Sequence, residues 1–228
     1  MTRPSSFVMI FLSVCLGMAG SGCKAKPTPA QPILVDTFER SELGPNWLDT
    51  SRTAKILEGK LTIADSYNHP VWLLRKLPRD VQIDFDASSK GPAGDLKIEI
   101  FGDGKSFGPD PANPGPAGYR YEPSGYEIVM GGWDNTRSII GRFGEHDATV
   151  KAARGAQAGT PIVAPGQTYH FTITRRGTVL DWRIDGVRFL TWSDPSPLYG
   201  HGHEHLAFSG WQAEVSFDNL TIRPLAAE

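Results

Sequence analysis

The stretch Val-Gln-Ile-Asp-Phe-Asp-Ala-Ser, residues 81–88, decides the fold class. Its apolar residues occupy every second position and polar residues fill the positions between them, the period of a β-strand with one buried and one wet face. The same alternation recurs in residues 96–100 and 169–174. From Ile33 onward no segment of helical length keeps the i, i+3, i+4, i+7 spacing of an amphipathic helix. The sequence therefore predicts an all-β domain.

Turn signals between the apolar runs indicate how the strands connect. Glu58-Gly59 and Asp185-Gly186 each predict a tight hairpin, because glycine supplies the positive φ that such turns need. The segment 107–118 contains four prolines and is expected to be a long loop, since proline cannot donate to a sheet ladder. About a dozen short strands without an internal repeat favour two antiparallel sheets packed face to face, a β-sandwich.

The N-terminal segment, residues 1–22, has the features of a bacterial export signal. Arg3 precedes an uncharged apolar stretch, and small residues stand directly before Cys23. The stretch is too short to remain as a membrane-spanning helix. The position of Cys23 resembles a lipobox, whose cysteine is acylated after cleavage, although Gly20 stands where leucine is usual. We therefore expect a lipoprotein signal peptide with lipidation at Cys23, ordinary secretion being the alternative.

The residues after the signal indicate a tether and then one domain. Residues 23–32 comprise the lipidated cysteine and a proline-rich tether, and residues 33–228 form the β-sandwich. Cys15 would be removed with the signal, so the mature domain is expected to rely on its hydrophobic core rather than on a disulfide. Lys24, rather than Asp, follows the lipidated cysteine. By resemblance to lipoproteins of two-membrane bacteria, this implies an outer-membrane location in the cell envelope, in either the periplasmic or the surface orientation.

The charge balance excludes one class of partner. The chain has 23 basic and 25 acidic residues, a formal net charge of −2, and removal of Arg3 makes it more negative. A nucleic-acid-binding domain normally carries an excess of basic residues. We therefore expect no nucleic-acid partner and a membrane contact through the lipid anchor alone.

Several short phrases distributed along the chain carry a family resemblance. They are Val35-Asp36-Thr37-Phe38, Leu57-Glu58-Gly59-Lys60-Leu61, Gly131-Gly132-Trp133, Trp182-Arg183-Ile184-Asp185-Gly186 and Phe217-Asp218-Asn219-Leu220-Thr221-Ile222. Together they resemble the concanavalin A-like jelly-roll superfamily of the laminin-G and glucanase type, over nearly the whole mature chain. The resemblance implies a jelly roll. It leaves the function open among sugar-binding modules, glycoside hydrolases and adhesion domains.

Two acidic residues near the ends of the domain are candidate metal ligands. In the last strand the apolar residues stand at odd-numbered positions up to Phe217 and at even-numbered positions from Leu220, which predicts a bulge near Asp218. The resemblance implies that the first and last strands are neighbours. Asp36 and Asp218 could then meet, and two carboxylates with backbone carbonyls suit a structural Ca²⁺. The alternative is that both acids bond turn amides. His201, His203 and His205 alternate in one stretch and are a weaker candidate for zinc.

Glycoside hydrolysis needs two carboxylates beside the scissile bond. The glucanase members of the superfamily carry Glu-x-Asp-x-x-Glu on one strand, and this chain does not reproduce that motif. Asp84 and Asp86 share one strand face, and Glu99 could lie on an adjacent strand. These three residues are the weak catalytic candidates, and the alternative is that they are solvated.

Tryptophans give the better support for a binding function. The chain has six, whose flat apolar faces can stack on sugar rings. Trp182 alternates with apolar residues and is expected in the core, whereas Trp133 precedes a polar stretch that includes Asp134 and Arg137. Tyr119 and Tyr121 are the next candidates.

The leading interpretation is a cell-envelope lipoprotein whose jelly roll binds carbohydrate without chemistry of its own. A glycoside hydrolase of the same fold and a protein-contacting structural or adhesion domain are the two alternatives.

Overall fold

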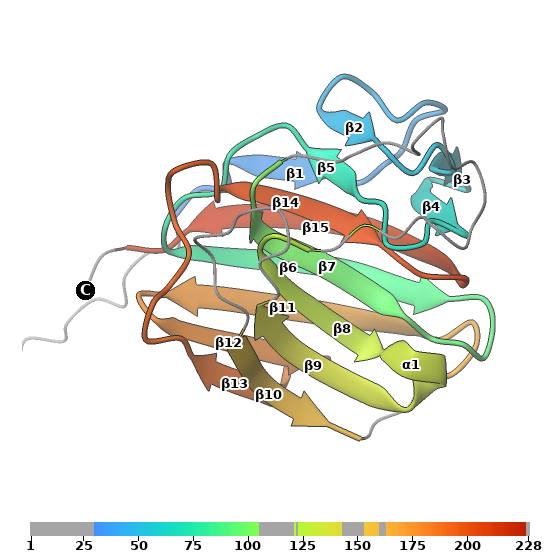
Figure 1. Cartoon of the computed structure of the whole chain (residues 1–228). Helices are drawn as coiled ribbons and strands as arrows, with labels where there is room; N and C mark the ends of the chain where they lie inside the picture. The colour runs from blue at the N-terminus through green and yellow to red at the C-terminus, as the bar shows by residue number, and fades with distance from the viewer. Residues whose placement is uncertain (1–29, 105–120, 122, 143–152, 160–162, 227–228) are drawn as a thin grey trace, which may run out of the picture.

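The computed structural model of the chain describes residues 30–104, 121, 123–142, 153–159 and 163–226. Two antiparallel sheets pack face to face in a sandwich (Figure 1). The predicted all-β jelly-roll sandwich is therefore confirmed. Within the described residues no helix is long and apolar enough to span a membrane.

One sheet has eight strands and contains both ends of the domain. Its order is β13-β12-β11-β6-β15-β4-β3, and β1 also pairs with β15. The strands are β1 (Leu34–Asp36), β3 (Lys55–Leu57), β4 (Lys60–Ala64), β6 (Val81–Ser89), β11 (Thr168–Arg176), β12 (Val179–Ile184), β13 (Val187–Ser193) and β15 (Glu214–Pro224).

The other sheet has seven strands in the order β10-β9-β8-β7-β14-β5-β2. These are β2 (Trp47–Asp49), β5 (Val71–Leu73), β7 (Leu96–Gly102), β8 (Tyr126–Gly131), β9 (Arg137–Arg142), β10 (Ala153–Ala158) and β14 (His205–Ser209). The short segment α1 (Gly132–Asn135) connects β8 to β9 and lies at the end of that hairpin (Figure 1).

Both predicted hairpins are present. Glu58 and Gly59 have φ of 51° and 70° between β3 and β4, and Asp185 and Gly186 have φ of 51° and 79° between β12 and β13. Two consecutive residues with positive φ match the twist of the flanking strands. The predicted neighbourhood of the first and last strands is also confirmed, as is the bulge in β15, where the pairing with β6 shifts between Asp218 and Thr221.

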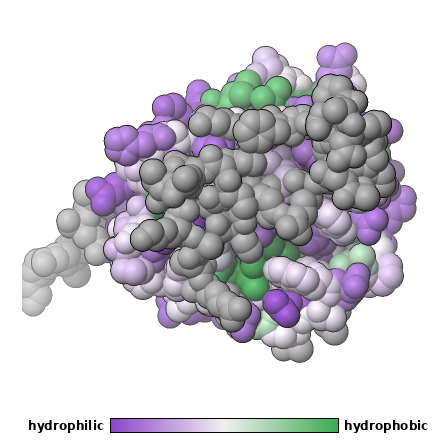
Figure 2. Space-filling model, viewed as in Figure 1, coloured by the Kyte–Doolittle hydropathy of each residue, from purple (hydrophilic) through white to green (hydrophobic). Residues whose placement is uncertain are grey.

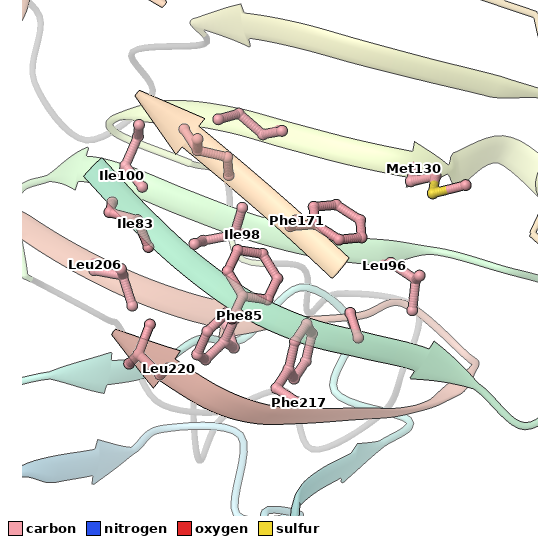
Figure 3. Packing of buried hydrophobic residues seen from close by; sticks show 14 of the residues in the cluster. Ile83, Phe85, Leu96, Ile98, Ile100, Met130, Phe171, Leu206, Phe217 and Leu220 are labelled. Atoms are coloured by element: carbon pink, nitrogen blue, oxygen red, sulfur yellow. The ribbon is translucent and has the colours of Figure 1, made fainter. Parts of the chain in front are cut away.

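Aromatic rings from both sheets meet in the core. Phe208 of β14 stacks on Phe217 of β15 with ring centroids 4.2 Å apart, and Phe85 of β6 lies 5.1 Å from Phe208. Figure 3 shows Phe85 and Phe217 among aliphatic side chains between the two layers. Trp182 is fully buried, as its alternation with apolar residues predicted. Burial of large rings is the main source of stability in a domain of this size.

Strand β7 departs from the expected pattern of one buried and one wet face. All seven of its residues are buried, including Lys97 and Glu99. The alternation correctly placed the apolar residues of β7 in the core, but its polar residues are buried as well. The polar side chains of β7 are instead held by groups from neighbouring segments, and they define the first candidate site.

Candidate functional site

A row of side chains crosses the outer face of the seven-stranded sheet. Glu127 of β8 is paired with Glu99 of β7, which is paired in turn with Ala207 of β14, and Ala207 with Trp72 of β5. Residues directly opposite each other in an antiparallel pair point to the same face. The row therefore places two carboxylates side by side and one indole two strands away.

Glu99 is the most deeply buried carboxyl of this row, with 3% of its surface exposed. Its Oε1 accepts hydrogen bonds from the amides of Ser124 (3.0 Å) and Gly125 (2.8 Å), from the Ser124 hydroxyl (3.1 Å) and from the Tyr121 hydroxyl (3.3 Å). Burial raises the pKa of Glu99 to about 8, against the lowering effect of these donors, and the nearby Glu127 charge raises it further. Burial therefore favours the protonated form of Glu99 at neutral pH.

Glu127 and Lys97 form the charged side of the row. Lys97 Nζ lies 3.7 Å from Glu127 Oε1 and 3.4 Å from Asp95 Oδ2, and it also donates to Asn68. All of these charged groups are at least nine-tenths buried. One ammonium group thus lies between two carboxyl groups. On this face Glu99, whose pKa is raised, therefore lies opposite Glu127, which forms an ion pair with Lys97.

At the other end of this row lie two aromatic residues, Trp72 and Tyr121. Trp72 meets Tyr121 edge to face, with ring centroids 6.1 Å apart. Gly102 lies between the indole and Glu99, because a Cβ at this position would approach both Trp72 Cη2 and Glu99 Oε1 to 2.5 Å. A side chain at position 102 would therefore push the ring and the carboxyl apart.

A second candidate site lies at the end of the β8–β9 hairpin. Trp133 is 50% exposed, the only tryptophan in the exposed class within the described part of the chain. The Arg137 guanidinium lies over its ring, 4.9 Å from the centroid, and Asp134 is exposed beside it. One face of the indole is thus covered by a cation, and two charged groups of opposite sign flank the ring.

The hairpin that carries Trp133 is held in an unusual backbone conformation. Trp133, Asp134 and Asn135 have φ of 52°, 56° and 61°, so α1 is a left-handed turn rather than a right-handed helix. This region is unfavourable for residues with a side chain. The Asn135 side chain compensates with three hydrogen bonds, to the carbonyls of Pro92 and Val163 and from the Val163 amide. The aromatic ring is therefore presented from a fixed turn.

The three weak catalytic candidates do not form one site. Asp84 and Asp86 lie on β6, whose neighbours are β11 and β15, whereas Glu99 lies on β7 in the other sheet. Both aspartates point to the outer face of their sheet, where Asp84 bonds Thr172 and Arg223. The expectation that Glu99 is adjacent to them was wrong, because β6 and β7 follow each other in sequence but belong to opposite layers.

The two expected metal ligands do not meet either. Asp218 is paired with Asp86 on the outer face, whereas Asp36 is paired with Leu220, a core residue. Asp36 accepts hydrogen bonds from Trp47 Nε1 (2.8 Å) and Arg40 Nη1 (2.5 Å). The register shift between Asp218 and Thr221 reverses which residues of β15 face the core, so the two carboxylates lie on opposite faces of the sheet. Their expected convergence was wrong.

The described residues also contain no cluster of three or more His, Cys, Asp or Glu side chains able to hold a metal ion. The alternating histidines are thus not gathered, and calcium binding stays a prediction without a defined site. Tyr119, the loop 107–118 and Cys23 lie outside the described residues.

The binding candidates of the sequence fall in two places. Trp133, Asp134 and Arg137 share the hairpin, whereas Tyr121 is buried against Glu99 and Trp72. Figure 2 shows largely hydrophilic or neutral side chains where this side of the molecule is coloured, with apolar residues in limited areas.

Glu127 was missed by the sequence analysis. Its alternation with Tyr126 and Ile128 indicates a strand, but only the pairing register shows that it opposes Glu99.

Comparisons with known proteins agree with the architecture. A family model described as "Farnesoic acid 0-methyl transferase" matches residues 113–221, slightly less than half of the chain. No curated protein matches the chain.

Solved structures of similar shape include a β-glucanase from Bacillus licheniformis (TM-score 0.55, 9% identity, 88% of this chain and 100% of that chain). A protein of unknown function with a galectin-like fold from Bacillus subtilis has a TM-score of 0.53 at 13% identity, covering 88% and 99% of the two chains. A structure described with endo-acting O-glycanases of the human gut microbiota has a TM-score of 0.52 at 13% identity, covering 86% and 100%. At these identities the likeness establishes the fold.

Proposed function

We propose that this domain binds carbohydrate and that Trp133, Asp134 and Arg137 make the contact. The observation that carries the proposal is the half-exposed indole on a fixed left-handed turn. A flat apolar ring next to hydrogen-bonding groups is the arrangement on which sugar rings stack. The named glucanase and O-glycanase neighbours support a carbohydrate-related role at the level of the fold.

The rigidity of the turn is part of this proposal. A ring that is already ordered loses little conformational entropy when a ligand binds, so more of the contact energy appears as affinity. The strained φ values at Trp133 and Asp134 are maintained by the hydrogen bonds of Asn135. Strain that a fold retains at an exposed position is a reason to look for function there.

The cellular setting is a further part of the proposal. The lipobox-like position of Cys23 supports a lipid anchor, and Lys24 supports outer-membrane sorting. The domain would then hold glycans of the envelope or the environment close to the membrane. Labelling with a radioactive fatty acid should mark the wild-type protein and not the Cys23→Ser variant.

The binding experiment compares glycan affinity among three variants of the full chain purified in detergent. A glycan array selects a ligand, and titration calorimetry then measures it on the wild type, Trp133→Ala, Trp133→Phe and Leu74→Ala. Leu74 is an exposed apolar residue outside the hairpin and serves as the control. We expect about tenfold weaker binding for Trp133→Ala, partial retention for Trp133→Phe and no change for Leu74→Ala. Equal affinity of all four proteins would refute the site.

A second function, glycoside hydrolysis, is favoured by one specific observation, the cross-strand pair of Glu99 and Glu127. Retaining glycosidases place two carboxyl groups roughly 5–5.5 Å apart, and directly opposed residues of an antiparallel pair have Cβ atoms about 4.5–5.5 Å apart. Glu99, whose pKa is raised by burial, would act as the acid, and Glu127, which lies beside Lys97, would act as the nucleophile. Release of reducing ends by the wild type, and its loss in both Glu99→Gln and Glu127→Gln, would support this function over simple binding.

A further inference from the structure

The outer face of the eight-stranded sheet carries a groove that is separate from both sites described above. It has a volume of about 990 Å³ and is formed by strands β6, β11, β12 and β13 together with the turn that joins β11 to β12. This volume is at the upper end of the range typical of ligand sites. We propose that the groove binds an acidic polysaccharide through the carboxylate or sulfate groups of its sugar units.

Two cross-strand rows build the floor of the groove. One row runs across all four strands, each residue paired with the next: Gln82, Thr174, Asp181 and Thr191. In the next row Thr172 is paired with Arg183, and Arg183 with Arg188. Because paired residues point to the same face, the groove presents guanidinium groups beside hydroxyl groups at the spacing of neighbouring strands.

The charge of the groove is positive although the chain as a whole is negative. Arg176, Arg183 and Arg188 line it, and Asp181 is the single acidic residue among the described residues that line it. Asp181 lies 3.1 Å from the Nε of Arg183 and 2.6 Å from the Nε of Arg188, so one carboxylate is shared by two cations. The described lining residues therefore carry a formal net charge of +2, from three arginines and one aspartate.

Arg183 and Arg188 keep terminal nitrogens that do not bind Asp181, and Arg183 Nη1 donates one hydrogen bond to the Gly186 carbonyl (3.3 Å). Both guanidinium groups contact Asp181 through Nε, and the Arg188 side chain is 62% exposed. Arg188 makes no further hydrogen bond within the described part of the chain. The planar fork of a guanidinium suits the two oxygens of a carboxylate or sulfate group.

The neutral side chains of the groove favour a sugar over other polyanions. Four threonines line it, and the hydroxyls of Thr172 and Thr191 donate to Asp84 and to the Leu180 carbonyl. Each of these oxygens keeps lone pairs that can accept from a sugar hydroxyl. None of the described lining residues is aromatic, whereas sites for single-stranded nucleic acids combine positive charge with aromatic platforms.

The test measures binding of polygalacturonate to the full chain in detergent, with neutral dextran as the comparison probe. We expect binding of polygalacturonate alone, weakening as salt is raised because the contact is electrostatic. The variant Arg183→Gln/Arg188→Gln should bind about tenfold more weakly. Asp181→Asn should bind more tightly, because it removes the carboxylate that holds the two arginines and competes with an anionic ligand. Arg52→Gln, an exposed position outside the groove, should leave the affinity unchanged.

Several outcomes would overturn the proposal. They are equal binding of dextran and polygalacturonate, an equal loss in Arg52→Gln, or weaker binding by Asp181→Asn with an unchanged thermal unfolding midpoint. Tighter binding to vesicles of anionic phospholipid than to polygalacturonate would show that the groove recognises a membrane instead. Trp133 does not line this groove, so Trp133→Ala tests only the proposed glycan site on the hairpin. The arginine variants test only the groove, and either proposal can fail without the other.

Discussion

Replacing Glu99 with Gln should remove a large pH dependence from the stability of the domain. In the unfolded chain this carboxyl ionises near its ordinary pKa of 4.5, whereas burial raises its pKa to about 8 in the folded protein. Between these pH values folding takes up a proton, so the free energy of unfolding falls as the pH rises. Stability contributed by the protonated carboxyl is complete below pH 4.5 and is lost progressively up to about pH 8.

The size of the effect follows from the same two pKa values. At about 1.4 kcal/mol for each pH unit, the interval corresponds to roughly 5 kcal/mol as an upper limit. Glutamine keeps an acceptor oxygen for Ser124 and Gly125 but does not ionise. The variant should therefore match the wild type at pH 5 and exceed its stability by several kcal/mol at pH 8.

Urea denaturation followed by tryptophan fluorescence at pH 5, 6.5 and 8 measures this difference. Glu42→Gln, a substitution of an exposed carboxyl, is the control and should follow the wild type at each pH. Parallel stability curves for the wild type and Glu99→Gln would refute the reasoning. That result would mean that the four hydrogen bonds to Oε1 keep Glu99 ionised, and it would remove the proposed acid of the hydrolase function.

Three further substitutions test the core and the hairpin. Trp182→Ala should lower the free energy of unfolding by about 3–5 kcal/mol in denaturant titrations, because it empties a fully buried site. Asp36→Asn should lower the free energy of unfolding by about 1–3 kcal/mol at pH 7, because it removes the anionic partner of Arg40. Burial raises the pKa of Asp36, but the hydrogen bonds from Arg40 and Trp47 bring it below its ordinary value. The difference in stability between the variant and the wild type should therefore vanish in acid, where Asp36 is protonated. Asn135→Ala should lower stability by about 2–4 kcal/mol in the same titrations, because it leaves buried Val163 groups unpaired, and calorimetry should show weaker glycan binding.

The regular strands and tight turns were predictable because their signals are local. Alternation with period two identified β6 and β11, and the Glu58-Gly59 and Asp185-Gly186 pairs identified hairpins. The bulge near Asp218 was also visible as a change of parity. Each of these features depends on residues a few positions apart, whose backbone preferences hold before any tertiary contact forms.

The candidate site was predicted only in part. Trp133 stood out because polar residues follow it, and the structure exposes it. Glu99 was paired with the wrong partners, because adjacency in sequence was taken as adjacency in a sheet. Glu127, the residue that pairs with Glu99, is 28 positions away in the numbering, and separation in sequence does not set the register of two strands.

The all-β class, the hairpins and the core segments were predictable, because hydrophobic alternation and turn chemistry act between residues close in the chain. Which strands share a sheet, and which polar residues lie in the interior, became known from the folded structure. It placed Asp84 and Glu99 in opposite layers, joined Glu99 to Glu127, and brought Arg183 and Arg188 together around Asp181. These pairings depend on strand order and register, which follow from packing two sheets over one core.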